Sequence, residues 1–318
     1  MLRITGLAIL LISLSLSALV NVRATDSTQD NLNRAIFYLQ NVAYNSTVHL
    51  CREAPRVAPN TYWIASDNLL AFKALEPYDP QLSLNISSTL VRLANLYHLP
   101  TSGDGLPVSL RYDVIIRDNA ALEIPPRTVN HLTLYHDSYI LKYDIANGTG
   151  KFSDWKEYAD LLLLVALSYH NQGDSRDATT YFMSAAEMWD GIGLRDKGFK
   201  QPYGEGQAPG DPHAYATYKL GLLLYVSGKL GLHLPFESNV TNRIWSMQNQ
   251  TDGGIFTHIM PDGSRGQSDT NTETTAMAIL GITSIKRQVP ESFMVLFVVM
   301  LCVVLLISAV TIRRIRHL

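Results

Sequence analysis

The chain has 318 residues, of which 47% are hydrophobic and 17% charged, and its formal net charge is −2. Residues 25–290 carry about six more acidic than basic side chains and contain no extended basic run. Because proteins bind a phosphate backbone through clustered Lys and Arg, this composition excludes nucleic acid as an expected partner. The same stretch is long enough for one large domain with its own hydrophobic core.

The two ends of the chain predict a protein anchored at the cell membrane. Residues 1–24 combine a basic start, an apolar run and small residues, which is typical of a cleaved signal peptide. An uncleaved N-terminal anchor is the alternative. Residues 293–312 form an uncharged stretch of 20 residues, enough for one transmembrane helix. The basic tail at 313–318 predicts a cytoplasmic C-terminus, with residues 25–290 outside the cell.

Cysteine usage and missing motifs exclude several kinds of site. Cys51 is the only cysteine of the predicted external domain, so an intrachain disulfide and a cysteine-based zinc site are excluded. A disulfide between two copies through Cys51 stays open. No G-x-S-x-G, Walker A or H-E-x-x-H motif occurs, and the stretch after Pro261 lacks the full pattern of a calcium loop. We therefore predict no metal ion and no cofactor.

Five N-glycosylation sequons lie in the predicted external domain, where glycosylation can occur. They begin at Asn45, Asn85, Asn147, Asn239 and Asn249. Any sequon that is used must lie on the molecular surface.

Apolar periodicity predicts a mainly helical domain with a small β-rich insert. Helical spacing occurs in eight segments: 31–43, 68–76, 84–98, 153–173, 175–191, 214–228, 238–248 and 271–285. Residues 106–118 and 129–145 alternate instead, the second segment on both sides of a predicted turn at 136–138. This pattern predicts two or three antiparallel strands within an insert of about 106–146.

Several segments resemble α/α toroid proteins. The stretch "QNQTDGGIFTHIMPDG" followed by "DTNTETTAMAIL" (248–280) is similar to the repeat of terpenoid-cyclase and prenyltransferase-like toroids. "TYWIASDNLLAFKAL" (61–75) and "YADLLLLVAL…MWDGIGLRDKGF" (158–199) resemble the six-hairpin glycosidase type, in which inner helix N-termini present acidic and aromatic residues to a sugar groove.

The resemblance implies a mainly α fold: an incomplete α/α toroid of helical hairpins with the β insert, plus the C-terminal transmembrane helix. A full toroid of this kind needs more helices than the eight predicted here, and the insert replaces part of the ring. The zinc site of prenyltransferases requires a cysteine that has no counterpart, and the D-x-D-D motif of the cyclases is absent. Those two activities are not expected.

Glycoside cleavage needs two carboxyl groups, one protonated and one ionised. The candidates near predicted helix ends are Asp67, Asp190, Asp196, Glu205, Asp211, Asp252, Asp269 and Glu273. Asp190 is the strongest, because it ends a helix, where the helix dipole disfavours a negative charge. It could equally accept hydrogen bonds from nearby loop amides. We predict a catalytic set of Asp190, Asp67, Glu205 and His213.

Several of the other candidates also have a structural explanation. Asp67 fits a helix N-cap. Thr270 and Glu273 fit a capping box at the start of the last helix. Asp252, before two glycines, fits a turn. His213 ends the irregular stretch 201–215 and could merely lead into the next helix.

Three aromatic residues are predicted to stack on a sugar ring: Trp63, Trp189 and Tyr203. Packing in the hydrophobic core is the alternative role for each of them. Together these features predict an external domain that acts on carbohydrate as a hydrolase or lyase, with a polysaccharide or other glycan as its partner. The competing prediction is a surface protein without enzymatic activity that binds a glycan or another protein.

Overall fold

The computed structural model describes residues 27–136, 138–200, 213–266 and 269–286. The predicted signal peptide (1–24), membrane span (293–312) and cytoplasmic tail (313–318) lie outside the described residues.

The transmembrane part of the predicted fold class finds no support among the described residues. Among the described helices, none has both the length and the apolar character that a bilayer crossing requires. Even α3 (Pro80–Leu96) has 17 residues and exposes polar side chains along one face, whereas a span needs about 20 mostly apolar residues. In the part of the chain that the structure describes, a transmembrane helix is therefore not supported. The described fold is a mainly helical body with small β-sheets.

All eight segments with helical spacing form helices. The first comprises residues 27–37 and continues as the π-helix η1 (Tyr38–Ala43). The others are α2 (Asp67–Leu75), α3 (Pro80–Leu96), α5 (Ala159–Asn171), α6 (Ser175–Ala186), α8 (Tyr218–Leu230), α9 (Glu237–Ser246) and α10 (Thr272–Lys286). The prediction is confirmed: the apolar residues in these segments recur at helical spacing and are buried in the helices that form.

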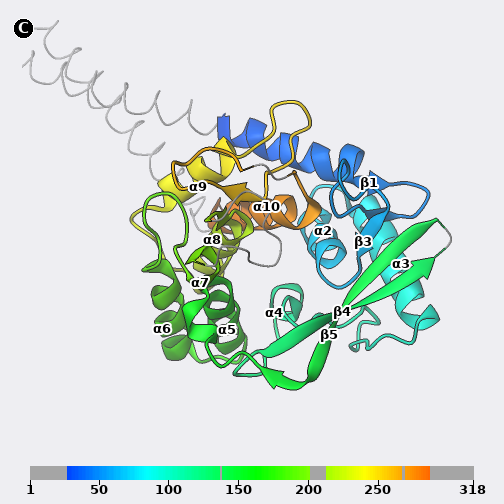
Figure 1. Cartoon of the computed structure of the whole chain (residues 1–318), viewed down its shortest axis with the longest axis horizontal. Coiled ribbons are helices and arrows are strands. Elements are labelled where there is room, and N and C mark those ends of the chain that lie inside the picture. The colour runs from blue at the N-terminus through cyan, green and yellow to red at the C-terminus, as the bar shows by residue number, and fades with distance from the viewer. Residues whose placement is uncertain (1–26, 137, 201–212, 267–268, 287–318) are drawn as a thin grey trace, which may run out of the picture.

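The helices form an inner and an outer set (Figure 1). Within the inner set, α2 packs on α10, α10 on α8 and α8 on α5, and the short helix α4 (Asp113–Ile116) contacts both α2 and α5. The outer elements η1, α3, α6 and α9 pack against α10, α2, α5 and α8 respectively. Inner helices are buried on nearly every side: in α5 all residues from Ala159 to Ser168 are buried. The outer helices keep one polar, exposed face.

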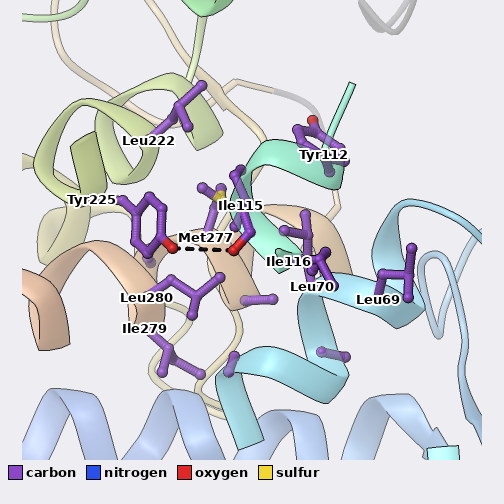
Figure 2. Close-up of a cluster of buried hydrophobic side chains, with 14 of the residues drawn as sticks. Leu69, Leu70, Tyr112, Ile115, Ile116, Leu222, Tyr225, Met277, Ile279 and Leu280 are labelled. Atoms are coloured by element: carbon purple, nitrogen blue, oxygen red, sulfur yellow. Dashed lines mark hydrogen bonds between the residues drawn. The ribbon is translucent and has the colours of Figure 1, made fainter. Parts of the chain in front are cut away.

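The hydrophobic core lies between the inner helices and α4 (Figure 2). Tyr225 of α8 lies beside Met277 and Leu280 of α10, and its hydroxyl donates to the carbonyl oxygen of Ile115 over 3.2 Å. This bond ties α8 to α4 across the core.

The second alternating segment forms the predicted hairpin. Strands β4 (Arg127–His136) and β5 (Tyr139–Lys151) pair antiparallel, and β3 (Thr61–Trp63) pairs parallel with β5, so the order is β3-β5-β4. Shorter elements are β1 (Tyr44–Asn45) with β2 (Leu50–Cys51), β6 (Tyr215–Ala216) with β7 (His258–Ile259), η2 (Trp155–Glu157) and α7 (Lys197–Lys200).

The strand predicted over residues 106–118 is wrong, because this segment forms turns and α4. Val114, Ile115 and Ile116 are all buried in succession between α2 and α5. A strand exposes every second side chain to one face, whereas a helical turn here buries three consecutive apolar ones. The Asp113 carboxylate accepts from the backbone amide of Ser109 over 2.8 Å and also pairs with Arg117, which stabilises this turn.

Candidate active site

Polar side chains meet where the four inner helices begin. Asp67 is the first residue of α2, and Asp160, Lys219 and Glu273 are each the second residue of α5, α8 and α10. The polar cluster, as we name it, consists of Asp67, Arg111, Tyr112, Asp160, Asp196, Tyr218, Lys219 and Glu273. Its members are linked by hydrogen bonds, ion pairs and electrostatic interactions.

One half of the polar cluster is a buried ion-pair network around Lys219. The Lys219 ammonium lies 2.5 Å from Oδ2 of Asp196 and 3.3 Å from Oδ1 of Asp160. Asp196 also accepts from the backbone amides of Ala159 (2.9 Å) and Phe199 (3.2 Å). The network joins α5, α8 and the segment before α7, and each buried charge has an opposite partner. It is a structural tie.

Glu273 belongs to the other half of the polar cluster. The Tyr112 hydroxyl donates to Oε1 of Glu273 over 2.5 Å. The predicted capping box is wrong, because Asn271 caps α10 instead: its Oδ1 accepts from the backbone amide of Thr274 over 2.9 Å. The cap at Asn271 leaves the Glu273 carboxyl free to point toward Tyr112 and Arg111.

Asp67 does not cap its helix either. Ser66 is the N-cap residue, no side chain makes a capping hydrogen bond there, and Asp67 is only 4% exposed. Its Oδ1 accepts from the Ser66 hydroxyl over 3.0 Å, whereas Oδ2 has no hydrogen-bond partner among the residues that the structure describes. Burial strongly destabilises the ionised form of a carboxyl group when only one of its two oxygens accepts a hydrogen bond.

The carboxyl groups of Asp67 and Glu273 influence each other's protonation. Burial raises the pKa of Asp67 well above its ordinary value, and the neighbouring charges of Glu273 and Glu53 raise it further. Burial also raises the pKa of Glu273, while the Tyr112 hydroxyl and the Arg111 guanidinium act in the opposite direction. Because only Glu273 has these partners for its ionised form, Asp67 is the member that holds the proton.

The two cations of the polar cluster are compensated by its other carboxylates. The half-buried Arg111 faces Asp160, which favours its charged form despite burial. Burial opposes ionisation of Asp160, but Lys219, Arg111 and the Tyr218 hydroxyl together lower its pKa below the ordinary value. The Tyr218 hydroxyl lies 2.8 Å from Oδ2 of Asp160. Asp160 is therefore the ionised centre of the cluster.

The predicted catalytic residues are not gathered in one place. Asp67 lies in the polar cluster, but Asp190 is exposed in the turn after α6 and accepts from the amides of Ile192 (3.0 Å) and Gly193 (3.2 Å) and from the Tyr215 hydroxyl (2.5 Å). Burial alone would raise the pKa of Asp190, yet these donors lower it. The arrangement matches the alternative role of Asp190, as an acceptor for loop amides.

The remaining predicted site residues also lie apart from one another. His213 is exposed, with Nδ1 3.2 Å from the Phe199 carbonyl oxygen. Trp189 stacks on Phe236, with ring centroids 5.7 Å apart, and packs against the hydrophobic core. Trp63 is half-buried at the end of β3, four residues before Asp67. Glu205, Asp211 and Tyr203 lie outside the described residues.

Several residues of the polar cluster escaped the sequence analysis. Arg111 and Tyr112 were missed because their segment was predicted as a strand. Asp160 and Lys219 had a usable signal, since each is a charged residue in the first turn of a helix and is followed directly by a mostly apolar run. Charged residues at such positions are seldom buried unless they are paired.

Of two pockets on the described surface, one includes a member of the polar cluster. A pocket of about 410 Å³ is lined by Phe72, Val91 and Leu106, among others, along α3. A second pocket, of about 230 Å³, includes Asp196 together with Arg195. Asp67 and Glu273 line neither of these two.

Comparisons of the sequence with protein-family models, with curated proteins and with solved structures give no match. The resemblance to α/α toroids therefore stays a prediction.

Proposed function

We propose that the protein cleaves a glycan by hydrolysis and that Asp67 and Glu273 are its paired carboxyl groups. The observation that carries the proposal is the buried Asp67 carboxyl, whose Oδ2 has no partner among the described residues, next to a second carboxyl on the adjacent inner helix. Glycoside hydrolysis requires two carboxyl groups in different protonation states.

The proposed step divides the work between the two groups. Asp67 donates its proton to the glycosidic oxygen as the bond from that oxygen to the anomeric carbon breaks. A water oxygen forms the new bond to the anomeric carbon, and Glu273 accepts the proton that this water releases. Return of one proton from Glu273 to Asp67 through solvent restores the starting state.

Hydrolysis is favoured over elimination by the pairing of the cations. A lyase acting on a uronic acid needs a positive group to neutralise the substrate carboxylate. Lys219 is already bound by Asp160 and Asp196, and Arg111 faces Asp160. The polar cluster therefore offers a carboxyl pair for acid–base chemistry and no cation without a carboxylate neighbour.

The test is the release of sugar products by the purified full chain from a panel of neutral, amino-sugar and uronic-acid polysaccharides. New reducing ends without absorbance from unsaturated sugars are expected. Asp67→Asn and Glu273→Gln are each expected to lower kcat by about a hundredfold or more, because each removes one half of the acid–base pair.

Asp190→Asn is the matched control, since it removes a carboxylate that the structure places in a turn outside the polar cluster. Its kcat is expected to stay within a few-fold of wild type. Detection of unsaturated sugars would show that the protein cleaves by elimination and not by hydrolysis. If folded wild-type protein releases no product from any polysaccharide, the competing function, binding of a glycan or a protein without cleavage, is favoured.

A further inference from the structure

The three-stranded sheet has one side turned away from the hydrophobic core. Tyr62, Leu141 and Tyr143 point to the core and are buried. Because successive side chains of a strand alternate between faces, their neighbours in sequence share the opposite face. The outer sheet face, as we name it, consists of Thr61, Trp63, His131, Thr133, Tyr135, Ile140, Lys142 and Asp144, which are matched across the strands by the pairing register.

The outer sheet face carries one exposed aromatic ring and one half-buried ring. Tyr135 is 78% exposed, and Trp63 is half-buried. The Trp63 ring lies edge-to-face with His131, with centroids 4.8 Å apart, and the Lys142 ammonium lies 5.0 Å from the centre of the Trp63 ring. These contacts hold the indole in position on a surface that carries polar groups on every strand.

The outer sheet face is continuous with the polar cluster. The Trp63 carbonyl oxygen accepts from the side-chain amide of Asn68, the residue after Asp67, over 2.8 Å. Asp144 lies two residues along β5 from Lys142, which pairs with Trp63, and it interacts electrostatically with both Arg111 and Glu273. The outer sheet face therefore adjoins the polar cluster on the side of Trp63 and Asp144.

The chemistry of the outer sheet face suits a glycan better than a protein. A protein interface has an apolar, well-packed centre, whereas Thr61, His131, Thr133, Lys142 and Asp144 make most of this face polar. Trp63 and Tyr135 provide flat apolar surfaces for the carbon-bound hydrogens of sugar rings. Thr133 provides a partner for their hydroxyl groups, and it lies next to the pair in which His131 Nδ1 is 2.9 Å from Oδ1 of Asp144.

The length of the face sets the size of the ligand. Tyr135 and Ile140 pair at one level of the sheet, and His131 and Asp144 pair four residues away. At about 3.3 Å per residue this distance is about 13 Å, which exceeds the length of one sugar ring. We infer that the substrate is a glycan chain of several units that lies along the outer sheet face and enters the polar cluster past Trp63. This inference rests on the proposed hydrolysis.

The experiment compares a polysaccharide that the wild-type chain cleaves with a disaccharide of the same linkage. Tyr135→Ala is expected to raise KM for the polysaccharide about tenfold, because one favourable contact is lost, and to leave kcat unchanged. The kinetics on the disaccharide are expected to be unaffected, because it does not reach Tyr135. Phe37→Ala, which removes a 53% exposed aromatic residue of the N-terminal helix, is the matched control.

A second measurement separates this inference from the proposed function. In affinity electrophoresis, Glu273→Gln protein should be retarded by gels that contain the polysaccharide, and the retardation should disappear when Tyr135→Ala is added. An unchanged polysaccharide KM in Tyr135→Ala protein would overturn the inference while hydrolysis stands. If the wild-type protein cleaves no polysaccharide, each polysaccharide of the panel is tested in a gel. If none of these gels retards the protein, the inference is overturned as well.

Discussion

At the scale of single residues, Asp67 is the side chain whose position is hardest to explain by stability. Its carboxyl is buried, its Oδ2 has no partner among the described residues, and Glu273 and Glu53 lie near enough to disfavour its charge. A polar group kept under such conditions lowers the stability of the folded state. Residues of this kind concentrate at functional sites, where the strained arrangement serves the chemistry.

The raised pKa of Asp67 predicts a pH-dependent stability. Between the ordinary carboxyl value of 3.8 and its raised folded value, Asp67 is ionised in the unfolded chain but protonated in the folded one. The unfolded state then binds fewer protons, so stability falls as pH rises through this window. Asp67→Asn removes the effect, and we expect urea unfolding at pH 7 to give a gain on the order of 1 kcal/mol.

The gain should shrink toward zero as the pH approaches 4, because the carboxyl is then protonated in both states. Asp190→Asn is expected to change stability in the opposite direction. The pKa of Asp190 is lowered in the folded state, so its carboxylate stabilises the fold at neutral pH and this stabilisation is lost in acid. A loss of stability in Asp67→Asn that is equal at pH 4 and pH 7 would mean that the Asp67 side chain has a packing role.

At the scale of elements, the contact between α8 and α10 decides how closely the inner helices approach. A Cβ at Gly221 would lie 2.6 Å from the carbonyl oxygen of Met277, and one at Gly281 would lie 2.3 Å from the carbonyl oxygen of Gly221. The two backbones therefore touch with no room for a side chain. This contact keeps the first turns of α8 and α10, and with them Lys219 and Glu273, at a fixed distance.

Gly281→Ala is expected to destabilise the fold by about 1–3 kcal/mol through overpacking, although alanine has the better helix propensity by about 1 kcal/mol. Thermal unfolding measures the effect. Gly103→Ala is the control, because no atom lies within 4 Å of the added Cβ there. Equal melting temperatures for the Gly281→Ala and wild-type proteins would show that α8 and α10 can separate without loss.

Element boundaries also explain which site residues were predicted. Asp67 was selected because it starts a segment of clear helical spacing, and the structure confirms that helix. Tyr112 was not selected, because alternation of apolar residues over 106–118 is compatible with a strand. The apolar pattern of residues 106–118 does not reveal that neighbouring helices bury this segment on all sides. Because of this burial, the segment forms a helical turn.

At the scale of the whole molecule, the sequons differ in their surroundings. Asn147 and Asn239 are exposed, on β5 and α9. Asn249 is 8% exposed, its side-chain amide donates to Asp252 over 3.1 Å, and its Oδ1 accepts from the amide of Thr251 over 2.9 Å. A glycan on Asn249 would displace this turn, which the glycines at 253 and 254 bring into contact with Arg34 and Tyr38.

We therefore expect folded protein from a eukaryotic secretory host to carry no glycan at Asn249, whereas Asn147 and Asn239 are available. Peptide mapping by mass spectrometry after enzymatic deglycosylation gives the occupancy of each site. Asn249→Gln should leave the mass of the glycoprotein unchanged apart from the substitution, and Asn147→Gln serves as the comparison. Full occupancy at Asn249 in folded protein would contradict the buried position.

The sequence by itself determined the eight helical segments and the β4–β5 hairpin, because the period of apolar residues reflects which face is buried. It also indicated Asp67 and Trp63, which stand next to a helix start. Only the tertiary structure decided that Glu273 turns toward Tyr112 and that Asp190 accepts from its own turn. It also decided that Arg111, Asp160 and Lys219 meet at the starts of the inner helices. These contacts join segments up to 161 residues apart, and their geometry depends on how whole helices pack.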